Sequence, residues 1–239
     1  MKINPIFRTT LDRDLPAGPQ GQPAHKKGES VASASLIKTN KLGHFLMVTP
    51  NPIFFYLNFS EHLIEEFKNE LLLINNSKKE WHMYKPTDTT PAEKFRNLDG
   101  DLLYSCIQKA IAIPIFLFTA IEAFVNQAIP EGYTYRTTNK KGFVIEFNKA
   151  EIERNLGTEE KLGIIMNEIH GKKLKQDSLW NYFMELKEMR NNLIHLKTRG
   201  KHMVVAYDSI YAELIDLDFD TFFKKTKEIM EFFIPDYFK

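Results

Sequence analysis

The sequence predicts a mainly α-helical protein, and three observations lead to that class. Long segments repeat apolar residues at intervals of three and four, which is the spacing of one helix face. The 239 residues are 43% hydrophobic, which is enough for one sizeable core. Extended patterns are confined to the N-terminal part and one short insertion. We therefore expect a helical domain over residues 60–239, with a β-hairpin inserted at about 131–150, after a flexible arm and extended segments over residues 1–59.

The N-terminal part is poor in apolar groups. Residues 9–35 collect Pro, Gly, Gln, Ser, His and Lys, and offer too little apolar surface to offset the entropy lost on ordering. A flexible arm is expected there. Two apolar runs, 45–48 and 53–57, then flank a turn rich in proline and asparagine. Such a pattern predicts two extended segments around a turn.

Two helices are expected between residue 60 and about residue 129. Ser60 is placed to cap a helix that runs to about Asn75, with apolar residues on one face. A long helix follows over about 99–129 and is apolar on most sides, so it should be central. Pro114 lies inside it and predicts a kink or a restart.

The same helix has enough apolar residues to suggest a membrane span. However, Pro114, Glu122, Asn126 and Gln127 interrupt the apolar run. We expect a buried core helix and no membrane partner.

The remaining elements follow from local patterns. Residues 133–137 and 143–147 flank a polar turn that ends in glycine, which predicts the inserted hairpin. A helix is expected to start at Thr158 and stop at Gly171. Another, capped by Asp177 or Ser178, should run to about Thr198. The last amphipathic helix covers about 220–233.

Compartment and charge limit the class of partner. Cys106 is the only cysteine, which excludes an intramolecular disulfide and a cysteine-rich zinc site. The first residues lack the apolar core of a signal peptide, so a cytoplasmic protein is expected.

A net charge of +1 indicates that any nucleic-acid contact comes from a local basic patch. Such a patch lies between Gly171 and Lys201. Its candidate RNA-binding residues are Lys187, Lys197, Arg199 and Lys201. The alternative is a solvated helix face.

The most informative segment is Arg190-Asn191-Asn192-Leu193-Ile194-His195, near the end of the helix that starts after Ser178. Arginine can bind a phosphate through paired hydrogen bonds, and histidine moves a proton near neutral pH. Together they suit cleavage of an RNA phosphodiester without a metal or other cofactor. His195 is the candidate acid or base, Arg190 the stabiliser of developing charge, and Asn191 the residue that orients either of them.

Helical geometry separates the two principal side chains. Arg190 falls on the apolar stripe formed by Leu179, Phe183, Leu186 and Leu193. A guanidinium there needs a reason, and Glu122 and Asn126 of the central helix are its expected partners. Structurally they would neutralise Arg190, and functionally they would position it in the site. His195 lies roughly opposite, on a second stripe with Trp180 and Met184. Large apolar groups outside the core face predict a partner helix, most simply from a second copy in a homodimer.

The arginine-to-histidine segment resembles the Arg-x4–6-His signature of the HEPN superfamily, including the polar residue directly after the arginine. The apolar helix that carries Glu122 and Asn126 is similar to the central helix of many members. The resemblance covers roughly residues 99–233 and implies a HEPN-like helical bundle that dimerises so that two motifs face one cleft. In active members it implies a metal-independent endoribonuclease. Many of these serve as toxins or as effectors of abortive phage defence, and some have a nucleotidyltransferase antitoxin as partner.

Three functions follow from these observations. The first is an RNA-cleaving homodimer with Arg190, Asn191 and His195 in its site. The second is a non-catalytic module whose cleft binds RNA, a nucleotide or a protein partner. The third is a purely structural protein in which Arg190 only pairs with a core carboxylate.

Overall fold

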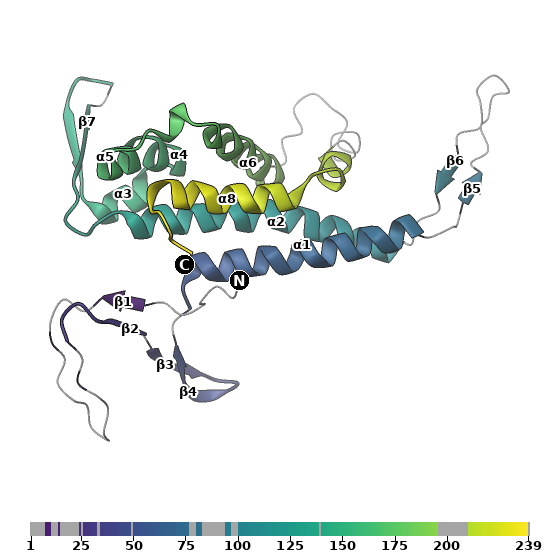
Figure 1. Ribbon diagram of the computed structural model, residues 1–239, viewed down its shortest axis with the longest axis horizontal. Coiled ribbons are helices and arrows are strands. Elements are labelled where there is room, and N and C mark those ends of the chain that lie inside the picture. The colour runs from purple at the N-terminus through teal and green to yellow at the C-terminus, as the bar shows by residue number, and fades with distance from the viewer. Residues whose placement is uncertain are drawn as a thin grey trace.

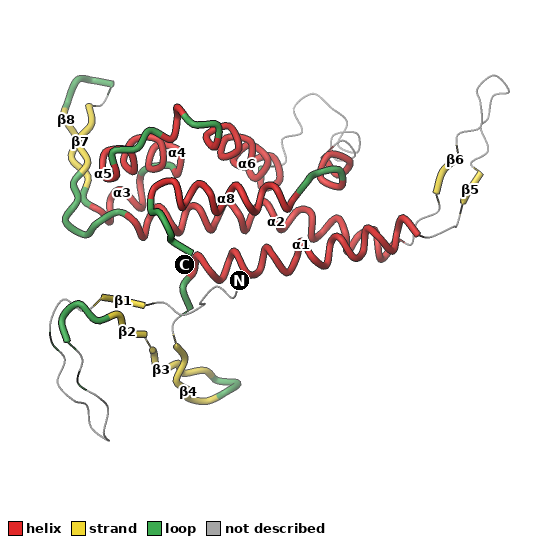
Figure 2. The backbone as a smooth tube through the Cα atoms, in the orientation of Figure 1, coloured by secondary structure: helices red, strands yellow, loops and turns green. Residues whose placement is uncertain are grey.

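The computed structural model describes residues 8–10, 14, 24, 26–32, 34–48, 50–76, 80–82, 94–96, 100–138, 140–195 and 210–238. These residues form a mainly helical protein, as predicted. The helices form one elongated bundle, and the strands lie at its periphery (Figures 1 and 2).

Four long helices make the bundle: α1 (Pro52–Asn76), α2 (Gly100–Ala128), α6 (Leu179–Ile194) and α8 (Phe219–Phe233). Short helical elements connect α2 to α6, namely α3 (Lys149–Asn155), α4 (Thr158–Glu160), the π-helical turn η1 (Lys161–Ile165), α5 (Met166–His170) and the 3-10 turn η2 (Leu174–Gln176). Residues 210–215 are also helical.

Among the described residues, each strand pairs with its neighbour along the chain as an antiparallel hairpin. The pairs are β1 (Arg8–Thr10) with β2 (Ser30–Ala32), β3 (Ala34–Thr39) with β4 (Gly43–Val48), β5 (Glu80–His82) with β6 (Lys94–Arg96), and β7 (Tyr135–Thr138) with β8 (Val144–Phe147). The last pair is the hairpin that the sequence predicts near residues 131–150.

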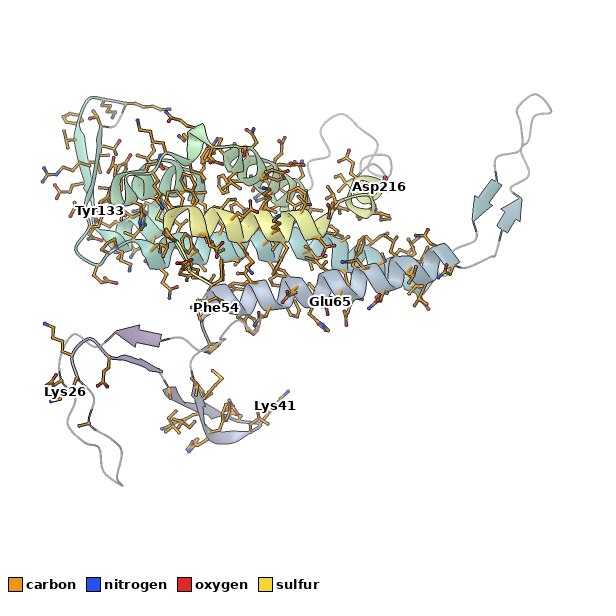
Figure 3. All side chains as sticks on the ribbon, in the orientation of Figure 1. Lys26, Lys41, Phe54, Glu65, Tyr133 and Asp216 are labelled. Atoms are coloured by element: carbon orange, nitrogen blue, oxygen red, sulfur yellow. The ribbon has the colours of Figure 1, made fainter. Side chains whose placement is uncertain are left out.

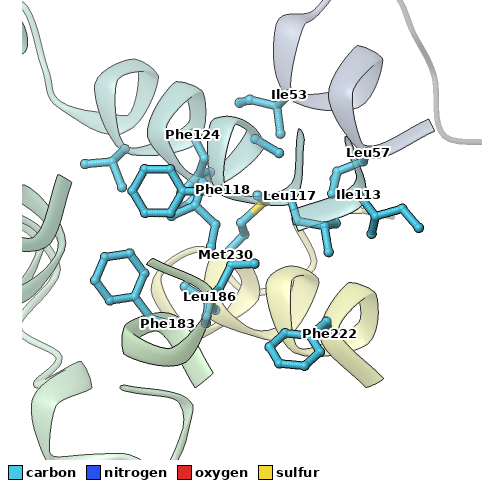
Figure 4. Close-up of a cluster of buried hydrophobic side chains, with 14 of the residues drawn as sticks. Ile53, Leu57, Ile113, Leu117, Phe118, Phe124, Phe183, Leu186, Phe222 and Met230 are labelled. Atoms are coloured by element: carbon cyan, nitrogen blue, oxygen red, sulfur yellow. The ribbon is translucent and has the colours of Figure 1, made fainter. Parts of the chain in front are cut away.

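Helix α2 is the centre of the core, as its apolar composition predicts. It contacts α1, α6 and α8, and ten of its residues are buried. Figure 4 shows Leu117 and Phe118 of α2 facing Phe183 and Leu186 of α6, with Met230 of α8 between the helices. The rings of Phe118 and Phe183 stack with centroids 6.1 Å apart. By length and hydropathy α2 could cross a membrane, but here three helices of the same chain pack against it.

Helix α2 runs without a break through Pro114, so the expected restart does not occur. The side chain of Pro114 is buried. Upstream, the expected flexible arm over residues 9–35 is only partly described, and the described part contains most of β1, all of β2 and the start of β3. The rest of the predicted arm lies outside the described residues.

The prediction for the start of α1 is wrong. Residues 53–57 are not extended but form the first turns of α1, and Ser60 lies inside the helix. Asn51 is the cap, because its side-chain oxygen accepts from the N–H of Ile53 at 3.0 Å and its carbonyl accepts from Phe55 at 2.9 Å. Pro52 suits the first helical position, where no N–H is needed. The Ser60 hydroxyl instead donates to the carbonyl of Tyr56 at 2.8 Å.

The segment between the inserted hairpin and α6 is more broken than the sequence suggests. Helix α3 is not among the elements predicted from the sequence, and it starts with a capping box between Asn148 and Glu151. The helix expected from Thr158 to Gly171 is present, but η1 interrupts it with a π turn. Gly171 ends it in the left-handed conformation at φ 66°, as expected. Helix α6 stops at Ile194, before the predicted end near Thr198.

The turn after Gly171 ties α5 to the end of α8. The ammonium of Lys172 donates to the carbonyl of Phe232 at 2.5 Å, within the last turn of α8. His170 lies beside it, with its ring 5.7 Å from the ring of Phe233. Its Nε2 is buried and has no hydrogen-bond partner among the described residues. Burial, and then the charge of Lys172, lower the pKa of His170 below 6.5.

The cap of α1 gives a first prediction. Asn51→Ala should lower the free energy of unfolding by about 1 kcal/mol, because the N–H of Ile53 loses its partner. Ser60→Ala should cost less, because a hydroxyl inside a helix is not its cap. Urea denaturation of both variants measures the difference. A larger loss for Ser60→Ala would show that the helix starts at Ser60 after all.

The environment of His170 gives a second prediction. A folded-state pKa below the unfolded value means that the unfolded chain binds more protons as the pH falls through 6.5. This group therefore contributes a loss of stability as the pH falls below about 6.5. The drop in the urea midpoint between pH 7.5 and 5.5 should be smaller in His170→Gln. The matched control is His62→Gln, since His62 is exposed and lies 3.2 Å from Glu66. If the two variants behave alike, burial of His170 is not the cause.

Candidate functional site

Helix α6 carries the predicted motif and is fixed to the core by the predicted stripe. Its buried residues are Leu179, Phe183, Leu186 and Leu193, which are the residues that the sequence assigns to that face. Asp177 caps its start by accepting from the N–H of Leu179 at 2.9 Å. The position of the motif therefore follows from how α6 packs on α2.

Arg190 is half-buried at the edge of this packed face. The central carbon of its guanidinium lies 5.3 Å from the ring centroid of Phe118, which is within the range of a cation–π contact. One terminal nitrogen donates to the side-chain oxygen of Asn191 at 3.0 Å. Phe118 and Asn191 therefore hold the guanidinium in place. Of the two residues that Asn191 is predicted to orient, Arg190 is the one whose side chain it contacts here.

The predicted ion pair between Arg190 and Glu122 is absent from the described part of the chain. Asn126, four residues after Glu122 on α2, accepts instead from the ammonium of Lys161 at 2.9 Å. Lys161 also donates to the backbone carbonyl of Glu153 at 3.0 Å. Burial lowers the pKa of Lys161, and the negative charge of Glu122 partly opposes that shift, so Glu122 also lies near that ammonium. Asn126 thus hydrogen-bonds Lys161, and Glu122 compensates the charge of Lys161 rather than that of Arg190.

Lys161 was not a predicted site residue, although it is only 1% exposed. Burial lowers the pKa of Lys161, and the charges of Glu122 and Glu153 partly oppose that shift. The sequence holds one signal for it, because Lys161 lies four residues before Ile165 and so shares the apolar side of its helix. The π turn η1, which starts at Lys161, has no comparable signal.

His195 lies at the C-terminal end of α6, as predicted, and is exposed. Its backbone N–H donates to the carbonyl of Asn191 at 2.9 Å and closes the last turn. Arg190 precedes His195 by five residues, which is about 140° around the helix axis. One chain does not bring these two side chains together.

The second stripe is less exposed than the sequence suggests. Trp180 and Met184 are half-buried and pack against the core of their own chain. The Trp180 ring lies 5.2 Å from that of Phe183 and covers Gly163, where an added Cβ would come within 2.9 Å of it. Trp180 and Met184 are therefore not a free surface for a partner helix. The exposed part is the end of α6, with Ile194 44% exposed beside His195.

One of the predicted RNA-binding residues lies within the described residues, and its charge is already paired. The ammonium of Lys187 forms an ion pair with Glu159 of α4. Both line a cavity of about 410 Å³ that also contains Phe118, the ring beneath Arg190, and Lys175. The predicted Lys197, Arg199 and Lys201 lie outside the described residues.

A larger groove lies on another side of α6, against residues 210–217, with a volume of about 590 Å³. Its floor is apolar and consists of Met189, Leu193, Ile210, Leu214 and Leu217. Four carboxylates and one amide complete its lining, namely Glu185, Glu188, Glu213, Asp216 and Asn192. Its acidic lining does not favour a phosphate. Among the described residues, no group of three or more His, Cys, Asp or Glu side chains could hold a metal ion.

Comparisons with known proteins give no relative, since no family model, no curated protein and no solved structure matches the chain.

The partner of Glu122 gives a third prediction, which a double-mutant cycle measures. Glu122→Gln and Lys161→Met should show a coupling energy of about 0.5–3 kcal/mol, because each removes the other's compensating charge. Glu122→Gln and Arg190→Met should add to within about 0.5 kcal/mol. Urea denaturation of the single and double variants gives both values. Strong coupling of Glu122 to Arg190 alone would restore the predicted ion pair.

Proposed function

We propose that this protein is a metal-independent endoribonuclease of the HEPN type. The observation that carries the proposal is the environment of Arg190. The described residues provide an aromatic ring and an amide for this half-buried guanidinium, but no carboxylate. A guanidinium that is held but not neutralised keeps donors for the paired hydrogen bonds that a phosphate accepts. The likeness of the segment from Arg190 to His195 to the HEPN signature supports RNA as the substrate.

The proposed reaction needs only protons and a fixed positive charge. A base removes the proton from a ribose 2′-hydroxyl, and the oxygen forms a bond to the adjacent phosphorus. The bond from phosphorus to the 5′-oxygen breaks, and that oxygen takes up a proton. The products are a 2′,3′-cyclic phosphate and a 5′-hydroxyl. His195 is the proton donor, and Arg190 stabilises the charge on the phosphoryl oxygens.

The complete site requires two copies in this proposal. Arg190 and His195 lie on different sides of α6, so a second copy supplies the group that one chain cannot place. Because Trp180 and Met184 pack on their own core, we place the contact at the exposed end of α6, near Ile194 and His195. His195 of one copy then acts beside Arg190 of the other.

The cellular role that we propose follows the resemblance. This combination of residues best fits a cytoplasmic toxin or abortive-infection effector that cleaves RNA. An antitoxin such as a nucleotidyltransferase would control it.

A second candidate is a HEPN-like module that binds RNA, a nucleotide or a protein without cleaving RNA. The packing of Trp180 and Met184 favours it, because a smaller contact surface makes a shared site harder to form. In that case Arg190 binds a phosphate and His195 has no chemical role.

Cleavage of RNA by the purified protein in EDTA gives the fourth prediction. His195→Ala should lower the cleavage rate by about 10²–10⁴, because it removes a general acid. Arg190→Ala should lower it by about 10²–10³, because it removes the stabilising donor. The products should carry 2′,3′-cyclic phosphate ends, which end-specific phosphatase and kinase treatment detects.

The matched control is His62→Ala, an exposed histidine on α1 that should leave the rate unchanged. Circular dichroism should show the same helical content in all variants. If cleavage in EDTA survives in His195→Ala, the proposed chemistry is wrong. Binding of RNA without cleavage, weakened by Arg190→Ala, would support the second candidate instead.

A further inference from the structure

The β3–β4 hairpin is an apolar and basic element that the rest of the chain leaves largely uncovered. Leu36 and Leu46 are cross-strand partners and are 61% and 73% exposed. Leu42 in the connecting turn is 75% exposed. A two-stranded hairpin is at best marginally stable on its own in water, and such an apolar surface is typical of a contact site.

The charge of this hairpin is entirely positive. Lys38 and His44 are cross-strand partners next to the turn, and Lys41 lies in the turn itself. The chain contains no Asp or Glu between Ser30 and Ser60. The turn is well defined, because the N–H of Leu42 donates to the hydroxyl of Thr39 at 2.9 Å and Gly43 has φ 71°. The tip of the hairpin therefore presents the exposed Leu42 beside Lys38 and Lys41.

The groove between α6 and residues 210–217 has the opposite properties. Its apolar floor includes Leu193 and Leu214, which are 9% and 2% exposed. The exposed carboxylates at its rim include Glu185 and Glu213, and no ion pair between described residues uses them. Its volume of about 590 Å³ has room for several side chains. An apolar floor with an acidic rim fits a leucine flanked by lysines.

The two surfaces lie on opposite sides of the molecule. Figure 3 labels Lys41 at the hairpin turn, below α1, and Asp216 at the groove, on the far side of α2 and α8. A chain with this structure does not fill its own groove with its own hairpin. Because both complementary surfaces belong to the same chain, the partner that they define is a second copy.

We propose that the tip of the β3–β4 hairpin of one copy binds in the acidic groove of another. Leu42 enters the apolar floor, and Lys38 and Lys41 face the carboxylates of the rim. The contact joins two different surfaces, so it is heterologous and can repeat from copy to copy. Asn192 lines the groove and Leu193 lies in its floor, so the docked hairpin rests against the turn of α6 that carries the motif.

This association does not depend on the proposed nuclease activity and is measured without RNA. We use light scattering and sedimentation velocity of the full chain at low ionic strength. Wild type should associate more strongly as its concentration rises, and more weakly as salt rises, because salt screens the charges. Lys38→Glu with Lys41→Glu, called the hairpin variant, should weaken association by about tenfold or more. Glu185→Lys with Glu213→Lys, called the groove variant, should do the same.

The decisive experiment mixes the two variants. Each variant alone carries like charges on its hairpin and its groove. In the mixture, the intact hairpin of the groove variant meets the intact groove of the hairpin variant, and the two exchanged surfaces are also complementary, so the mixture should associate about as strongly as wild type. A chain with all four substitutions should associate again, because the charges are exchanged. Matched controls are Lys140→Glu with Lys141→Glu on the other hairpin turn, and Glu61→Lys with Glu65→Lys on α1. Both should associate as wild type does.

Three results would overturn the proposal. The first is a wild-type chain that stays monomeric at all concentrations and salt levels. The second is a folded mixture of the two variants that does not associate, as expected if hairpins pair only with hairpins. The third is equal weakening by the controls, which would make net charge the cause. A chain that associates as described but cleaves no RNA would refute only the nuclease proposal.

Discussion

The apolar surface of α2 is the constraint on which the rest of the structure depends. On its own, this helix would expose a large apolar area to water, and α1, α6 and α8 bury that area by packing around it. The stack of Phe118 on Phe183 joins α2 to α6 and sets the position of every residue along α6. Arg190 lies above Phe118 because α6 packs there. The position of the candidate site is thus a consequence of core packing.

The same burial creates a need for positive charge inside the bundle. Glu122 and Asn126 lie on α2 among apolar residues, and a polar group there costs free energy unless it has a partner. Lys161 meets that need from η1, although it loses most of its own hydration. Since one buried ammonium already compensates Glu122, Arg190 does not have to. This division of the charges leaves the guanidinium with the donors that a phosphate requires.

Local patterns in the sequence predict the elements that have a clear apolar face or a clear turn signal. The apolar spacing gives α2, α8 and the buried stripe of α6, and the polar turn with glycine gives the β7–β8 hairpin. The start of α1 is missed because Ile53 to Leu57 is apolar without a gap, a pattern that a strand and a buried helix turn share. The partner of Glu122 is missed because it depends on η1, which brings Lys161 to α2 from far along the chain. Periodicity describes one helix face and cannot choose between two distant cations.

Helical spacing predicts that the side chains of Arg190 and His195 point to different sides of α6. The structure adds which surfaces of α6 are exposed to a second molecule. The separation of these side chains around α6 means that any chemistry that uses both residues needs a second contributor. The half-buried Trp180 and Met184 leave less surface for a helix-to-helix contact than the sequence suggests. What stays exposed is the end of α6 on one side and the acidic groove on another. A groove with carboxylates repels RNA, so it separates the side of α6 that we propose binds phosphate from a side suited to basic protein surfaces. One helix can therefore serve an RNA contact and a protein contact, because its faces carry opposite charges.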